Sequence, residues 1–435
     1  MKKIITLLIL TLLALLFWFF QPKILPYYSQ LTKERVGLNV DLQPKSQKSA
    51  KFVGSKACQE CHKEEYHAWS HSLHSKMIQS IKNNPSVVVA NFSTLPKDAD
   101  FTLKDAIYTV GSKFKQRYMI PATINGKEDF RLGNYQWNVE TQKWQKFKPY
   151  KYWYKDAYAH DNHEFPTSNA CDGCHFTGYM SREKRIEPAI GCESCHGAGG
   201  NHIEEPNSPI YKASNFDPIR SNEVCLQCHM RNRDKRLDAN ISVKDLWAKA
   251  KDYPAGYEAG KPLIDYKKPA PFTLGVESKE FWANGAAKKN RTQGNEFIHD
   301  AMYRHGITCI NCHNPHELSN RADKPEGNKA CMKCHSFGSI IGPHQNSLEA
   351  HTHHKADSKG SLCIECHMPK TARHTGKSPL SVRSHKFKFT SPKETKYYKM
   401  PKETNACYAC HKEQSLDELQ KDLESWGMIS WEEIR

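Results

Sequence analysis

Eight copies of one short motif constrain this chain of 435 residues more than any other feature. All 16 cysteines fall in Cys-x-x-Cys pairs, and a histidine directly follows every pair. Because only 23 residues are histidine, eight such matches would occur by chance with a probability on the order of 10⁻¹⁰. The cysteines are Cys58, Cys61, Cys171, Cys174, Cys192, Cys195, Cys225, Cys228, Cys309, Cys312, Cys331, Cys334, Cys363, Cys366, Cys407 and Cys410.

This pattern is the attachment signature of c-type haem, in which two thiols bind the porphyrin and the adjacent histidine binds the iron. Zinc sites also use Cys-x-x-Cys units, but they do not require a histidine after each one. We therefore expect eight covalent haem c groups and no cysteine left for a structural disulfide. The expected proximal ligands are His62, His175, His196, His229, His313, His335, His367 and His411.

The first 24 residues have the pattern of an export signal. Lys2 and Lys3 precede an uncharged apolar run over residues 4–20, and no small-x-small cleavage site follows. As a helix this run spans roughly 25 Å, at the short end of what a bilayer requires. We favour an uncleaved membrane anchor, with a removed signal peptide as the alternative. Either way, the bulk of the protein is expected on the periplasmic side of the bacterial cytoplasmic membrane, where c-type haem is attached.

The formal net charge of +16 has an explanation in the cofactors. Basic chains often bind nucleic acid or anionic lipid, but eight haems with ionised propionates contribute about −8 when oxidised and about −16 when reduced. Much of the lysine and arginine then offsets propionates, and we expect no nucleic-acid partner. The charge also allows a residual basic patch that binds anionic lipid, an acidic partner or an oxyanion.

The low hydrophobic fraction of 38% predicts a mainly α-helical and irregular protein whose core is a stack of haems. We expect a small antiparallel β insertion and an N-terminal membrane helix as additions. Short β-prone runs begin at Tyr108, Gln116, Phe130 and Tyr135, and residues 415–426 should form a helix. The expected segments are a signal or anchor helix (1–24), a linker (25–50), the first haem segment (51–100), a β-rich aromatic segment (101–165), haems two to four (166–235), an extended wrap (236–298), haems five to seven (299–370), and the eighth haem with the C-terminal helix (371–435).

The motifs at 171, 192 and 225 repeat in spacing at 309, 331 and 363. An internal duplication explains this repeat, and shared packing geometry explains it equally well.

Several phrases around the motifs resemble a known family. They include Trp69-Ser-His-Ser-Leu-His74, Gly294-Asn-Glu-Phe-Ile-His299 and Arg383-Ser-His385. Together they resemble the multihaem cytochromes of the cytochrome c-552/c-554 type, relatives of the multihaem nitrite reductase and hydroxylamine-oxidising lineage. By position, the resemblance implies distal iron ligands at His74, His202, His299, His316, His353 or His354, and His385.

The remaining histidines are more simply explained as surface residues, although about two of them must bind iron if every haem is closed on both sides. They are His67, His71, His160, His163, His305, His344, His351 and His374. Three methionines, Met119, Met230 and Met368, are thioether ligand candidates of lower weight, because methionine more often fills packing gaps.

Two functions fit this sequence. The favoured one is a membrane-anchored periplasmic cytochrome that moves electrons between redox partner proteins or a quinol-oxidising membrane complex, through haems with two histidine ligands each. The alternative is an octahaem oxidoreductase that acts on nitrite, hydroxylamine, tetrathionate or sulfite at one haem with an open iron. The nitrite-reductase relatives often mark that haem with a Cys-x-x-Cys-Lys motif, which this chain lacks. Catalytic residues and oligomeric state are not specified by the sequence.

Overall fold

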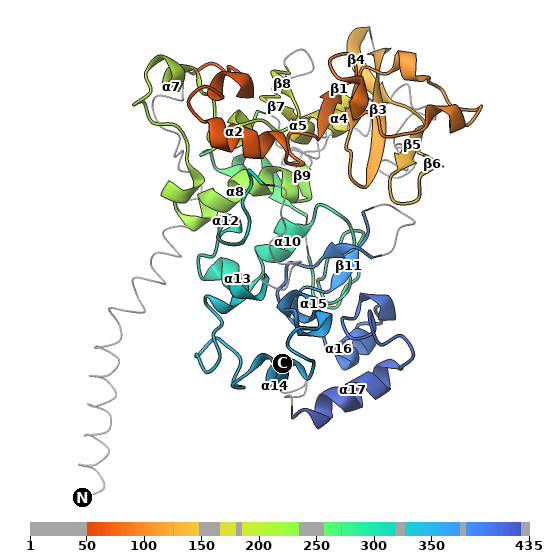
Figure 1. Ribbon diagram of the computed structural model, residues 1–435, viewed down its shortest axis with the longest axis vertical. Coiled ribbons are helices and arrows are strands. Elements are labelled where there is room, and N and C mark those ends of the chain that lie inside the picture. Colours follow the sequence, from red (N-terminus) through yellow and green to blue (C-terminus); the bar gives the residue numbers. More distant parts are fainter. Residues whose placement is uncertain are drawn as a thin grey trace, which may run out of the picture. The chain divides into compact units, whose positions relative to one another are not determined.

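A computed structural model of the protein describes residues 50–124, 126–147, 166–179, 185–234, 256–270, 272–317, 327–374 and 380–427. Figure 1 shows short helices joined by irregular segments, with one small sheet near the start of the described chain. This agrees with the predicted architecture. Within the described ranges no helix is both long and apolar enough to cross a membrane. The predicted anchor at 1–24 and linker at 25–49 lie outside these ranges.

Most of the haem motifs occupy a single helical turn. In a helical turn, residues three and four apart share one face, so the two thiols and the histidine of each motif point the same way. The α-helices are α2 (Lys63–Ser70), α4 (Thr167–Ala170), α5 (Asp172–His175), α6 (Glu193–His196), α7 (Gly200–Glu204), α8 (Pro218–His229), α10 (Gln293–Phe297), α11 (Ala301–Arg304), α12 (Cys309–Cys312), α13 (Asn328–Met332), α14 (Leu348–Thr352), α15 (Cys363–His367), α16 (Pro392–Tyr397) and α17 (Leu416–Ser425).

Helix α8 shows how the sequence sets such an element. The Asp217 side chain accepts hydrogen bonds from the backbone N–H groups of Ile219 and Arg220, and Pro218 occupies the first helical position. The helix ends at His229, the last residue of the fourth motif. Short 3-10 turns lie at η3 (Ser55–Cys58), η4 (Pro85–Val87), η5 (Phe92–Thr94), η6 (Leu103–Asp105), η8 (Ala213–Asn215), η10 (Leu263–Asp265), η13 (Lys359–Ser361) and η14 (Lys402–Thr404).

One antiparallel sheet forms the predicted β insertion. Its strands follow the order β1-β2-β3-β5-β6, and β4 also pairs with β3. The sheet begins at β1, upstream of residue 101, so part of the predicted first haem segment belongs to it. Its strands are β1 (Ile78–Ser80), β2 (Tyr108–Val110), β3 (Lys115–Ile124), β4 (Lys127–Leu132), β5 (Tyr135–Asn138) and β6 (Lys143–Lys146). Two-residue and three-residue ladders join β7 (Phe176–Thr177) to β8 (Glu187–Pro188), β9 (Asn232–Asp234) to β10 (Lys267–Pro269), and β11 (Lys370–Ala372) to β12 (Val382–Arg383).

The sheet has two different faces because side chains alternate along a strand. On β3, Met119 packs into a cluster that contains Cys171 and Cys174 of the second motif. Its neighbours Tyr118 and Ile120 point into a separate aromatic cluster. One face of the sheet therefore supports the second haem motif.

The predicted C-terminal helix is confirmed. Helix α17 starts after Ser415, whose hydroxyl accepts from the backbone N–H of Glu418 while the Glu418 side chain accepts from the Ser415 backbone in return. Between residues 256 and 298 the described chain is mostly turns and bends, apart from β10, η10 and α10.

A buried arginine fastens the second motif to the sheet. Arg185 Nη2 lies 2.7 Å from Asp129 of β4 and 2.6 Å from Asp172, which stands between the two cysteines of the motif. Both carboxylate side chains are 0% exposed. Ser168 also donates to Asp129, at 2.5 Å. Because Arg185 pairs with both buried carboxylates, its loss removes a favourable charge interaction from each of them.

We predict that Arg185→Ala lowers the free energy of unfolding by about 3–5 kcal/mol, since it removes the cation that pairs with two buried carboxylates. The matched control is Lys146→Ala, which removes an exposed ion pair with Asp98 and should cost at most about 1 kcal/mol. Urea unfolding of the haem-loaded protein measures both. Equal losses from the two variants would contradict a buried clamp.

Candidate haem-binding site

One continuous cavity contains residues from seven of the eight motifs. Its volume is about 3990 Å³, several times the roughly 300–1,000 Å³ of a site for one small ligand. Cysteines of the second to eighth motifs line it, together with most of the motif histidines. The interior therefore has room for several large cofactors in contact, as the low hydrophobic fraction predicts.

Six motif histidines each face a second imidazole, and four of these pairs line the cavity. The ring centroids of every pair are 6.0–6.3 Å apart, too far for direct ring contact in the four pairs whose planes lie within 8–25° of parallel. The pairs are His62 with His202, His229 with His74, His196 with His316, His313 with His385, His367 with His351, and His411 with His354.

These distances fit an iron held between two imidazoles. A metal bonded at roughly 2 Å to one nitrogen of each ring leaves the centroids roughly 6 Å apart. The donor set also fits, because imidazole nitrogen is a common axial ligand of haem iron. The residues present thus match haem c, with thiols for the covalent bonds and imidazoles for the metal.

Backbone carbonyls orient many of these rings. Nδ1 of His74 donates to Pro315 O at 3.2 Å, and Nδ1 of His202 donates to Ser208 O at 2.9 Å. Comparable bonds hold His196, His354 and His385 through Tyr211 O, Thr352 O and Arg383 O. A proton held on Nδ1 leaves Nε2 unprotonated and free to bind iron.

Burial favours the neutral, metal-binding form of the paired histidines. For several of these imidazoles, burial is the largest cause of a lowered pKa, because a charged ring loses its hydration inside the protein. The pKa values of His229 and His385 fall to about 4. The pKa is also lowered for His74, His196, His313, His351 and His367.

The structure distinguishes the neighbouring histidines of α14 and the turn after it. His351, which we expected to be a surface residue, lies opposite His367, and His354 lies opposite His411. His353, by contrast, stacks on Trp426 with 4.4 Å between centroids. It adopts a left-handed backbone conformation at φ 54°, which turns its side chain away from those of its neighbours. Sequence spacing alone could not separate three histidines within four residues.

The other sequence candidates have different surroundings. His299 lies beside Phe272, with 5.7 Å between ring centroids, and forms no such pair with a motif histidine of the described residues. His67 and His71 lie against each other on and after α2, and His305 and His344 line the cavity. Met119 and Met230 are buried, Met368 lines the cavity, and His160 and His163 lie outside the described residues.

His175 and His335 of the second and sixth motifs differ from the other six. Neither has an imidazole opposite it at this distance among the residues that the structure describes. Three cations, Arg291, Arg117 and Lys115, act on His175. Burial is the largest cause that lowers the pKa of His175 to about 3, and the charges of these residues lower it further. The pKa of Lys115 itself falls to about 7, through burial and then Arg117 and Arg231. A site with this charge attracts anions.

Contacts between cysteines show how the motifs follow one another in space. Cys195 of the third motif neighbours both cysteines of the fourth, Cys312 neighbours the sixth motif, and Cys366 neighbours the eighth. The resulting order is first, third, fourth, fifth, sixth, seventh and eighth, with the second beside the fourth. Four cysteine pairs from different motifs are close neighbours: Cys58 with Cys192, Cys174 with Cys228, Cys225 with Cys309, and Cys331 with Cys363.

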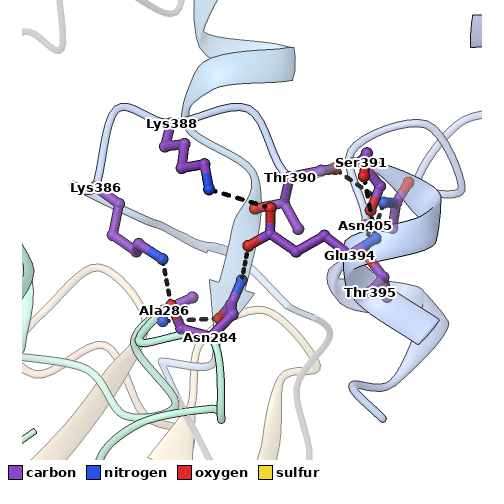
Figure 2. Close-up of polar contacts among 9 residues, drawn as sticks. All are labelled: Asn284, Ala286, Lys386, Lys388, Thr390, Ser391, Glu394, Thr395 and Asn405. Atoms are coloured by element: carbon purple, nitrogen blue, oxygen red, sulfur yellow. Dashed lines mark hydrogen bonds and ion pairs between the residues drawn. The ribbon is translucent and has the colours of Figure 1, made fainter. Parts of the chain in front are cut away.

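A polar network fixes the segment that carries His385. Glu296 of α10 accepts from the His385 backbone N–H at 2.8 Å and from the Ser384 hydroxyl at 2.6 Å. Figure 2 shows the continuation, in which Lys386 donates to the Asn284 carbonyl and Lys388 lies 3.4 Å from Glu394. These bonds fix the backbone at His385, while the ring itself bonds to the Arg383 carbonyl. No sequence motif marks Glu296 or Glu394 for this role.

Part of the chain matches a protein family. The Cytochrome c554 and c-prime family matches residues 57–107 and 131–197, which include the first three motifs and part of the sheet. Among solved structures, the outer cell wall cytochrome OcwA has a TM-score of 0.66 and 25% sequence identity, with 86% of each chain covered.

Two curated proteins also match. The dissimilatory sulfite reductase MccA of Wolinella succinogenes is 25% identical over 404 residues, which cover 73% of this chain and 51% of that protein. The multiheme cytochrome MtrA of Shewanella baltica is 26% identical over 164 residues, which cover 37% of this chain and 46% of that protein. The chain thus spans about half the length of the curated relatives it matches.

We predict that His351→Ala converts one haem of the purified protein from low spin to high spin, because it removes the imidazole opposite His367. His353→Ala is the matched control, since His353 stacks on Trp426, and its spectrum should equal that of the wild type. Electron paramagnetic resonance of the oxidised protein measures both. A spin change in the His353 variant and not in the His351 variant would reverse the assignment.

Proposed function

We propose that this protein, a multihaem c-type cytochrome, conducts electrons through eight covalently bound haems, most of them closed by two histidines. The observation that carries the proposal is the set of six imidazole pairs with centroids 6.0–6.3 Å apart. Haem iron with two protein ligands exchanges electrons without binding substrate, and its reduction potential depends on those ligands and their surroundings.

The protein's own residues keep this exchange fast. Buried rings held by backbone carbonyls move little between oxidation states, so little reorganisation accompanies each transfer. Cysteines of different motifs are close neighbours at four places. Electrons would then pass from the first motif through the third and fourth to the eighth, with the second as a side branch.

The exchange partners in this proposal lie outside the cytoplasm. The apolar run at residues 4–20 supports an N-terminal anchor in the bacterial cytoplasmic membrane, or a periplasmic protein if that run is removed. A quinol-oxidising membrane complex or a redox partner protein would supply or accept the electrons. Matches to a sulfite reductase and to a multiheme cytochrome are compatible with either direction of flow.

A second function is favoured by the surroundings of His175. Lys115, Arg117 and Arg291 act electrostatically on this histidine, and the paired arrangement of the other motifs is not present there among the described residues. His175 would hold the iron of the second haem, and that haem would supply an open site for reduction of a small oxyanion such as nitrite or sulfite, with electrons delivered by the neighbouring haems. The cations would stabilise the anion, because donors fixed in a water-poor pocket need no rearrangement to do so.

We predict a mixed spectrum for the oxidised protein. Electron paramagnetic resonance and resonance Raman should show at least six low-spin haems that do not respond to nitrite, and a high-spin component that does. Fewer than six low-spin haems would contradict the imidazole pairs. Eight low-spin haems that all ignore nitrite and cyanide would refute the second function and leave electron transfer standing.

The charge around His175 gives a further expected result. Arg117→Gln should weaken nitrite binding at least roughly tenfold, because it removes one buried positive charge. Binding of carbon monoxide to the reduced haem, in which the ligand stays neutral, should stay within roughly twofold of the wild type. Equilibrium titrations followed by haem absorbance measure both ligands. Equal weakening for the two ligands would show that the arginine acts on structure and not on charge.

A further inference from the structure

We propose that Gly360 and Trp426 hold the imidazole of His354 crossed against that of His411, and that this crossing raises the reduction potential of the eighth haem. The inference rests on the proposed function, because it takes His354 and His411 as the two axial ligands of one iron. It names two positioning residues that lie outside every haem motif. Gly360 belongs to η13, and Trp426 follows the last residue of α17.

The six imidazole pairs fall into two groups by the angle between their ring planes. Four pairs lie within 8–25° of parallel. The pair of the fourth motif crosses at 75°, and that of the eighth motif, His354 with His411, crosses at 54°. The seventh motif neighbours the eighth, and its pair is the closest to parallel, at 8°. The seventh and eighth haems therefore differ in the geometry of their ligands.

Gly360 leaves the space that the His354 ring occupies. A Cβ atom at this position would lie 2.6 Å from Cγ of the ring and 2.9 Å from its Nε2, well inside the 3.5–4.0 Å at which nonbonded carbon atoms pack. The ring is also held by its Nδ1, which donates to Thr352 O at 2.6 Å. A residue larger than glycine would therefore displace the imidazole and strain that hydrogen bond.

The turn that carries Gly360 is fixed on both flanks. Ser361 is buried, and its hydroxyl donates to Ala356 O at 2.7 Å. The side chain of Asn328 donates to Ser361 O and accepts from the backbone N–H of Cys363, both at 2.9 Å. Because Cys363 begins the seventh motif, the turn cannot move away from the His354 ring without disturbing that motif.

Trp426 makes a second contact with the same ring. The centroids of Trp426 and His354 are 6.3 Å apart and their planes differ by 87°, an edge-to-face arrangement of the kind that aromatic rings prefer. The backbone N–H of Trp426 donates to Leu423 O at 3.2 Å, and Leu419 and Leu423 of α17 are buried. The indole is thus anchored by a packed helix, and it opposes rotation of the His354 ring.

The angle between two axial rings affects the energy of ferric iron. Each imidazole interacts with the iron d orbitals through its π system, so parallel rings separate two of these orbitals in energy and crossed rings leave them nearly equal. The separation stabilises ferric iron, which lacks one electron in these orbitals, but not ferrous iron, in which they are full. Groups that fix ring orientation thereby tune the metal, and crossed rings give the higher reduction potential.

This difference has a direction along the proposed line of haems. An electron on the seventh haem, with its parallel rings, moves spontaneously to a neighbour of higher potential. The crossed rings of His354 and His411 would give the eighth haem that higher potential. Gly360 and Trp426 would then help to make the eighth haem the place where electrons collect at this end of the line.

Electron paramagnetic resonance distinguishes the two ring geometries in the oxidised, haem-loaded protein. Crossed rings give a low-spin signal with one very large g value, whereas parallel rings give a rhombic signal. Trp426→Ala frees the His354 ring to turn, so the large-g signal should lose the intensity of one haem, and a potentiometric titration should show one lowered potential. Gly360→Ala should also shift the signal of one haem, because the added methyl group displaces the ring.

Two further variants show whether ring position is responsible. Trp426→Phe keeps an aromatic edge beside His354 and should restore the wild-type signal and potential. Gly199→Ala is the matched control, because this glycine precedes the paired His202 by three residues and a Cβ there meets its neighbours at an ordinary 3.5 Å. Its spectrum should equal that of the wild type. The Trp426 variants keep the test valid if Gly360→Ala fails to fold.

His354→Ala separates failure of this inference from failure of the proposed ligand pair. It should convert one haem to high spin. If it does so while Gly360→Ala and Trp426→Ala leave every signal and potential unchanged, the positioning role is overturned and the pair stands. If His354→Ala changes no spin state, the pair is refuted and the positioning role with it. A Trp426→Phe spectrum equal to that of Trp426→Ala would also count against the edge contact.

Discussion

The pairing of imidazoles from distant parts of the chain is the interaction on which the rest of this structure depends. His74 lies opposite His229, and His196 lies opposite His316, so a single metal site joins segments that share no strand or long helix. A chain with mostly short helices has few other means of holding such segments together. Metal binding and folding are then one event, because ligands that are far apart in sequence meet only when iron joins them.

The protein scaffold supplements these sites with buried carboxylates. Glu193 accepts backbone N–H bonds from Val53, Gly54 and Gly199, and Glu296 holds the segment of His385. Each carboxylate connects a motif or an axial histidine to a remote stretch of backbone. Such groups cost free energy to bury and repay it only when their hydrogen bonds are complete, which explains why they lie at the joints between haem segments.

The second motif combines a rigid support with an unusual charge. The sheet and the Arg185 clamp hold it from one side, while Lys115, Arg117 and Arg291 surround its histidine. Its thiol contact with the fourth motif places it beside the main line of motifs. This position supports the proposal that electrons from the line of motifs reach a ligand-binding haem.

What the sequence by itself determined is local. The haem motifs, the strands that contain Tyr108 and Phe130, and the helix after Ser415 follow from residue spacing, β propensity and capping within a few positions. What only the tertiary structure decided is which distant groups meet. It placed His351 and His354, and not His353, opposite motif histidines. It also brought cations from two segments, β3 and the residues before α10, near His175. Contacts between distant groups depend on the path of the whole chain, and a local pattern of residues does not specify that path.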